Sequence, residues 1–170
     1  TAIIGFVNVL ATVAAIGLVD RWGRKPLLYA GFITMTIPMG ALALLNHNGL
    51  DGQAAKLLCV FLIMIFIAAH AMSAGPLMWV LCSEIQPIKG RDLGITLSTL
   101  TNWVSNMIVG VSFLSLLNAL GAPLTFGLIA ALNAVFFVFT RLLVPETRGV
   151  SLEEIEQNLM AGKKLRDIGR

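Results

Sequence analysis

Amide and hydroxyl side chains recur inside long apolar stretches of this 170-residue sequence. Between positions 98 and 112, polar residues fall within about 80° of Asn102 on a helical wheel at about 100° per residue; they are Ser98, Thr99, Asn102, Ser105, Asn106 and Ser112. Such groups exchange hydrogen bonds with hydroxyl-rich molecules, but Ser, Thr and Asn also join helices to one another. We favour helix contact for Ser98, Ser105 and Ser112, whereas for Asn102 both roles stay open at this point.

Groups that catalyse reactions are scarce in the same stretches. An enzyme needs paired acids, an activated nucleophile or a metal cluster, whereas His70 is the only ionisable side chain deep within them. We interpret His70 as a neutral imidazole bonded to a neighbouring helix. Cys59 and Cys82 lie at opposite ends of one stretch and are interpreted as reduced hydrophobic residues. The sequence predicts no enzyme, no metal site and no cofactor.

The composition indicates that these stretches lie in a bilayer. Hydrophobic residues make up 57% of the chain, charged residues 12%, and the mean hydropathy is +0.86. A helix needs about 20 apolar residues to cross a lipid bilayer. Continuous stretches of that length predict an all-α integral membrane protein with five transmembrane helices at 1–19, 27–45, 57–82, 93–117 and 124–144. Residues 145–170 are predicted to form a polar cytoplasmic tail. A capping box at Ser151–Glu154 predicts a short helix that begins near residue 152.

The distribution of Lys and Arg predicts the orientation of the helices. Eleven of the twelve lie in loops 20–26 and 83–92, at Arg141 or in the tail. Because basic loops remain on the cytoplasmic side, we place both loops and the C-terminus there. No basic surface with interleaved aromatic residues indicates nucleic-acid binding. Five crossings place the two ends on opposite sides, so we expect further helices before Thr1.

Three motifs lie at the predicted cytoplasmic ends: "GLVDRWGRK" at 17–25, "GPLMWVLCSEIQPIKGRDLG" at 75–94 and "PETRGVSLEEIE" at 145–156. In this order they resemble signatures of the sugar porter family, within the major facilitator superfamily. The match covers the whole chain as helices eight to twelve plus the tail of a C-terminal half-bundle. "AMSAGP", "TNWVSNMIVG" and "NLMAGKKLRDIG" resemble the bacterial galactose and arabinose proton symporters of that family.

The resemblance implies part of a secondary transporter that moves a monosaccharide, a hexose or pentose, across the cytoplasmic (inner) membrane by alternating access. It implies a proton as coupling ion and an N-terminal half of the same polypeptide as partner. Two alternatives use the same scaffold, a facilitative sugar uniporter and a non-transporting sugar sensor. A sensor usually carries a long cytoplasmic extension, and the tail here is short.

Sugar-binding roles follow from the resemblance. Asn8 and Asn102 match amides of the family's eighth and eleventh helices, and Trp79 matches its sugar-site tryptophan. The Gly75-Pro76 pair before Trp79 predicts a break in the helix, since proline removes a backbone hydrogen bond. We expect Trp103, which lies too deep for an interfacial aromatic belt, to flank the cavity together with Asn106.

The charged motifs have a second implied role. In the family, ion pairs at the cytoplasmic ends hold the inner gate shut when the transporter faces outward. The resemblance assigns this gating role to Asp20, Arg21, Arg24, Glu84, Arg91, Glu146 and Arg148.

Overall fold

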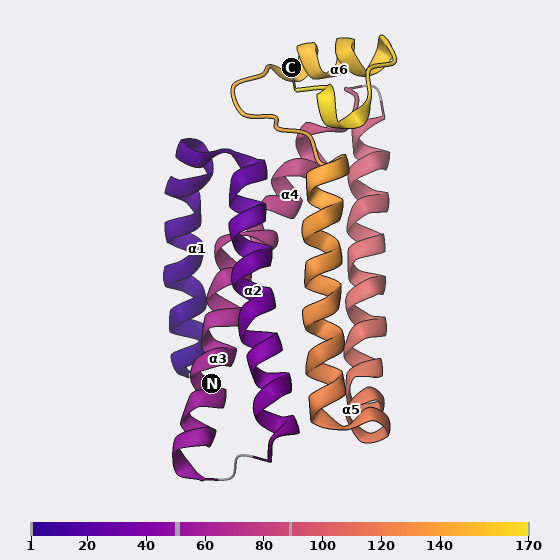
Figure 1. Ribbon diagram of the computed structural model, residues 1–170. Helices are drawn as coiled ribbons and strands as arrows, with labels where there is room; N and C mark the ends of the chain where they lie inside the picture. Colours follow the sequence, from indigo (N-terminus) through magenta and orange to yellow (C-terminus); the bar gives the residue numbers. More distant parts are fainter. Residues whose placement is uncertain (1, 50–51, 89, 170) are drawn as a thin grey trace.

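The computed structural model describes residues 2–49, 52–88 and 90–169, without the side chains of residues 2–4 (Figure 1). All regular structure in this part of the chain is helical, which confirms the predicted fold class. The helices are α1 (Ala2–Trp22), α2 (Arg24–His47), α3 (Gln53–Met72), α4 (Ala74–Glu84), α5 (Arg91–Leu143), α6 (Leu152–Met160) and the short 3-10 helix η1 (Leu165–Asp167).

Helix α5 reverses direction at Gly121. Its backbone there has φ 75° and ψ 169°, a conformation that glycine adopts without steric cost. Pro123 follows in the first turn of the returning segment, where its missing N–H has no helical partner to lose. Figure 1 shows the first arm, residues 91–120, beside the antiparallel second arm, residues 122–143. Among the described residues, four helical segments are long and apolar enough to cross a membrane, and the reversal at Gly121 divides the last of them into two arms.

The span predicted at 57–82 is divided into α3 and α4 at Ser73. Ser73 has φ −129° and ψ −93°, and its hydroxyl donates to the Ala69 carbonyl oxygen at 2.6 Å. The break lies three residues before Pro76 rather than directly before Trp79. A proline ring clashes with the carbonyl four residues earlier, here that of Met72, so the chain leaves the helix immediately after it.

Helix α2 organises the bundle. It contacts α1, α3, α4 and α5 and lies between α1 and the second arm of α5 in Figure 1. Near its beginning, Leu27 and Leu28 are buried with Val19 of α1 and with Leu77 and Leu81 of α4. Further along, Met39 and Leu42 are buried against Ala130 of the second arm. The first arm is much less covered, and residues 103–111 are all exposed.

Gly31 of α2 allows close passage over the α3–α4 break. A Cβ atom at Gly31 would overlap the hydroxyl and the Cβ of Ser73, which is 1% exposed. We expect Gly31→Ala to destabilise the full-length protein by about 1–3 kcal/mol through overpacking. The measurement is the free energy of unfolding by denaturant in detergent micelles.

Gly40→Ala in the same helix is the matched control, since nothing lies within 4 Å of the added Cβ. We expect it to be neutral or stabilising by about 0.5–1 kcal/mol, as alanine is the better helix former. Gly31→Ala combined with Ser73→Gly should recover part of the loss. Equal stabilities of the two single alanine variants would contradict the steric explanation.

Candidate functional site

An ion pair joins the beginning of α2 to the end of α4. Arg24 Nη2 lies 2.7 Å from Glu84 Oε1, and Arg24 Nε donates to Glu84 Oε2 at 3.3 Å. The two side chains are only 15% and 18% exposed. Two parallel bonds from one guanidinium fix the orientation as well as the distance of the pair. Thr147 of the tail is buried and donates its hydroxyl to Glu84 Oε2, so the same carboxylate also binds the tail.

Glu146 caps the first turn of α2 from the tail. Its Oε1 accepts the Arg24 N–H at 3.0 Å and its Oε2 accepts the Lys25 N–H at 2.9 Å. The first N–H groups of a helix have no partner within it and carry partial positive charge, so a carboxylate is well placed there. Gly23, at φ 92°, makes room: a Cβ would lie 2.8 Å from Glu146 Oε2.

Three of the predicted gating residues, Arg24, Glu84 and Glu146, are thus brought together at one end of the bundle. The side chains of the other four form no ion pair or hydrogen bond with these three within the part of the chain that the structure describes. Asp20 and Arg21 are exposed at the end of α1 without an ion pair among the described residues. Arg148 is exposed and contributes its backbone N–H, which donates to Glu146. Arg91 has Nε and Nη2 buried, with no hydrogen-bond partner among the described atoms. Its gating role remains a prediction.

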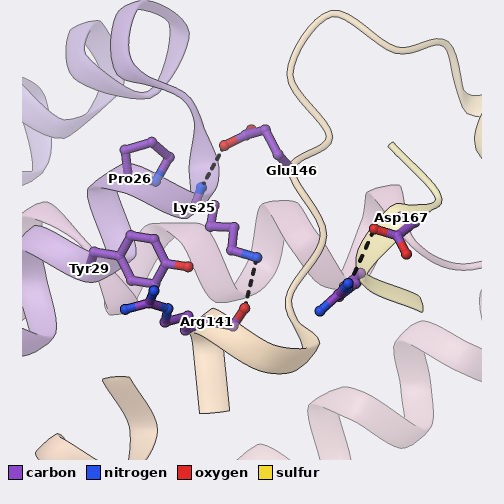
Figure 2. Close-up of a pocket in the computed structure, with 7 residues that line it drawn as sticks. Lys25, Pro26, Tyr29, Arg141, Glu146 and Asp167 are labelled. Atoms are coloured by element: carbon purple, nitrogen blue, oxygen red, sulfur yellow. Dashed lines mark hydrogen bonds and ion pairs between the residues drawn. The ribbon is translucent and has the colours of Figure 1, made fainter. Parts of the chain in front are cut away.

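Two further residues contact this group of charges but are absent from the predicted gating residues. They are Lys25 and Thr147. Lys25 Nζ donates to the Arg141 carbonyl oxygen at 3.1 Å and lies 6.0 Å from the centre of the Tyr29 ring (Figure 2). Both residues stand inside the motifs that carry the other charges, and that proximity is the sequence signal that points to them. We name the set Arg24, Lys25, Glu84, Glu146 and Thr147 the charge cluster.

The amides predicted to bind sugar lie on two helices. Asn8 of α1 is exposed, and the Thr12 hydroxyl donates to its carbonyl oxygen at 2.9 Å. On the first arm of α5, Asn106 Nδ2 donates to both the carbonyl oxygen and Oδ1 of Asn102 at 3.0 Å. Asn106 thereby fixes the Asn102 amide, whose Nδ2 has no hydrogen-bond partner among the described residues.

Both tryptophan side chains that are predicted to contact the sugar are exposed. Trp79 of α4 is 44% exposed and Trp103 of the first arm is 64% exposed. Helix α4 contacts both α1 and α5, so it connects the two amide-bearing helices. The candidate sugar-binding residues therefore lie on three helices, α1, α4 and the first arm, and their common role remains a prediction. Amides at membrane depth hydrogen-bond protein, water or a polar ligand, because lipid tails offer no partner.

A bundle of apolar helices long enough to cross a membrane, with one of them broken and with amides along two others, defines a class, that of membrane transport proteins. Within that class, the chain belongs to the sugar (and other) transporter family, whose model matches residues 1–159.

Its relatives include proton-coupled sugar carriers. The chain is 59% identical over 169 residues to the galactose-proton symporter and 50% identical over 172 residues to the arabinose-proton symporter, both of Escherichia coli K12. These alignments cover 99% of this chain and 36% of each relative.

Among solved structures, the inward-open xylose transporter XylE from E. coli superposes with a TM-score of 0.79 at 32% identity, covering 92% of this chain and 34% of XylE. Another structure describes XylE as a major facilitator superfamily proton:xylose symporter bound to 6-bromo-6-deoxy-D-glucose, with a TM-score of 0.68 at 30% identity over 99% of this chain and 33% of XylE. The chain therefore spans about a third of the length of the relatives it matches.

Proposed function

We propose that this chain supplies the last five membrane helices and the tail of a proton-coupled monosaccharide transporter. Family membership and 59% identity to a galactose-proton symporter support this proposal. A hexose such as galactose is the proposed substrate, and the first half of the same polypeptide and the surrounding bilayer are the proposed partners. Because the family consists of transporters, we propose no enzymatic activity.

The observation that carries the proposal is the exposure of amide and indole side chains on α1, α4 and the first arm, which we propose form one wall of the sugar cavity. A monosaccharide leaving water must replace its hydrogen bonds, and amides beside an indole ring provide donors, acceptors and a flat apolar face. The wall is uncovered in this chain, as expected if a first half completes the cavity. Alternating access then consists of rocking the two halves about the bound sugar.

The charge cluster supports a gating role for the end of the bundle at which α2 begins and α4 ends. It ties α2, α4 and the tail into one unit through contacts with Glu84 and Glu146. A partly exposed ion pair is worth about 0–1 kcal/mol, so several must act together to bias two conformations by a few kcal/mol. We propose that this unit moves as one body and that Arg91 takes its partner from the first half.

We also propose that the charge cluster and the tail face the cytoplasm, since eleven of the twelve basic residues in the sequence lie in loops 20–26 and 83–92, at Arg141 or in the tail. Exposed positions at the two ends of the bundle suit cysteine labelling, Ile88 near the cluster and Asn48 opposite it. In intact cells an impermeant thiol reagent should label Asn48→Cys and leave Ile88→Cys unlabelled. The reverse pattern would invert the proposed topology.

Proton coupling is tested with the full-length protein in de-energised cells in weakly buffered medium. Adding galactose should make the medium more alkaline, because each sugar enters with a proton, and a protonophore should abolish the change. A uniporter would equilibrate labelled galactose across the membrane without moving protons, and a sensor would do neither. Cells carrying the empty vector provide the baseline, and a galactose signal no larger than theirs would refute symport.

A further inference from the structure

A cationic cavity of ≈ 490 Å³ lies beside the charge cluster, between the beginning of α2, the end of the second arm and η1. Lys25, Arg141 and Arg166 line it together with Tyr29, and Figure 2 shows the labelled members of this set around one space. None of the three cations was assigned to the proposed sugar site. They come from three separate elements, so only the folded chain gathers them.

The two carboxylates of the cavity already have partners. Glu146 accepts the Arg24 and Lys25 N–H groups of α2, and Asp167 Oδ1 lies 3.5 Å from Arg166 Nε. Three cations and two carboxylates line the cavity, which leaves one positive charge in excess; Arg166 pairs with Asp167, whereas Glu146 is bound by backbone N–H groups. Guanidinium groups present several donors in a fixed fork, a geometry that suits phosphate oxygens.

An apolar hollow adjoins the cationic cavity. Tyr29 and Arg141 line both, and Ile33 and Phe137 complete the second hollow, of ≈ 430 Å³. Ile33 is 48% exposed, and Phe137 packs its ring against Tyr29 with centroids 5.3 Å apart. From the cavity, the hollow runs along α2 and the second arm toward the membrane interior. Charged and apolar surfaces thus follow one another in the order of a phospholipid headgroup and its acyl chain.

We propose that an anionic phospholipid of the surrounding bilayer binds here, its phosphate against Arg141 and Arg166 and one acyl chain along Ile33 and Phe137. Basic pockets between helices at the cytoplasmic surface suit anionic headgroups. The apolar continuation argues for a lipid, because a soluble anion would occupy the cavity alone. This site lies on α2 and the second arm, away from the wall proposed to bind sugar, and stands independently of the proposed transport activity.

Native mass spectrometry of the full-length protein with added phosphatidylglycerol tests the proposal. Arg141→Gln combined with Arg166→Gln should weaken phosphatidylglycerol binding by about 10- to 30-fold, from the attraction that each cation near a membrane surface exerts. The matched control is Lys56→Gln combined with Lys164→Gln, which removes two exposed cations outside the cavity. It should bind phosphatidylglycerol as tightly as the wild type.

Further arms separate lipid from other ligands. Arg141→Lys combined with Arg166→Lys retains the charge and should retain most of the binding, which distinguishes a lost site from a misfolded protein. Equal affinity for phosphatidylethanolamine, or unchanged phosphatidylglycerol binding by the glutamine variant, overturns the proposal. Glycerol 1-phosphate binding as tightly as the lipid would identify a site for soluble anions instead.

Discussion

Replacing Asn102 by alanine in the full-length protein is expected to weaken sugar binding by about 5- to 150-fold. The Asn102 Oδ1 already accepts a hydrogen bond from Asn106 Nδ2, so the Asn102 Nδ2 is left to donate to a sugar oxygen. Losing one buried amide partner costs about 1–3 kcal/mol, which corresponds to that range of affinities. Isothermal titration calorimetry of the purified protein with galactose measures the change.

Trp79→Ala should weaken binding to a similar extent for a different reason. Its ring offers a flat, 44% exposed apolar surface just beyond the α3–α4 break, and a sugar ring loses that contact in the alanine variant. If Trp79 were only an interfacial anchor, the substitution would instead lower membrane insertion and yield. Protein yield and the elution profile in size-exclusion chromatography distinguish the two.

Ser112→Ala is the control for both variants. Its hydroxyl donates to the Ile108 carbonyl oxygen within the first arm, so it is already satisfied within its own helix. We expect affinity within about 2-fold of wild type, a change of about 0.4 kcal/mol or less. Unchanged affinity in Asn102→Ala and Trp79→Ala would show that these residues pack helices or anchor the interface, and the site assignment would be withdrawn.

The second large effect is expected at Glu84. Glu84→Ala removes the acceptor of the Arg24 guanidinium and of the Thr147 hydroxyl at once. Hydrogen bonds to charged groups contribute about 1.5–3 kcal/mol, and a desolvated guanidinium left alone adds a penalty. We expect the free energy of unfolding by denaturant in micelles to fall by about 2–3 kcal/mol.

Asp20→Ala is the matched control, because its carboxylate is exposed and has no ion pair among the described residues. It should change stability by less than about 0.5 kcal/mol. Exchanging the charges, Arg24→Glu with Glu84→Arg, should restore part of the loss, although the geometry of Thr147 is not reproduced. Equal losses for Glu84→Ala and Asp20→Ala would mean that the ion pair adds no net stability.

Local sequence features determined much of this protein. Apolar stretches of about 20 residues can cross a bilayer only as helices, so the transmembrane segments follow from composition alone. The stripe around Asn102 likewise follows from helical period, since residues four positions apart lie on the same face, and Asn106 indeed bonds Asn102. Motif order was sufficient to predict the family that the comparison identifies.

The helix break has a local cause, the Gly75-Pro76 pair, and a packing contact that the sequence does not reveal. Pro76 explains why the chain leaves the helix after Met72. A close contact between two helices stabilises the break at that position. Gly31 of α2 passes directly over Ser73, so packing between helices stabilises the break there. That contact joins residues far apart in the sequence, and no local pattern reports it.

The partners of the charges were decided by the tertiary structure alone. Asp20, Arg21 and Arg24 share one motif, yet within the described part of the chain Arg24 alone of the three forms an ion pair, because the end of α4 lies beside the first turn of α2. Glu146 caps that turn from 122 positions away. Sequence spacing places side chains on a face of their own helix, whereas helix packing decides which ends meet and hence which charges are close enough to interact.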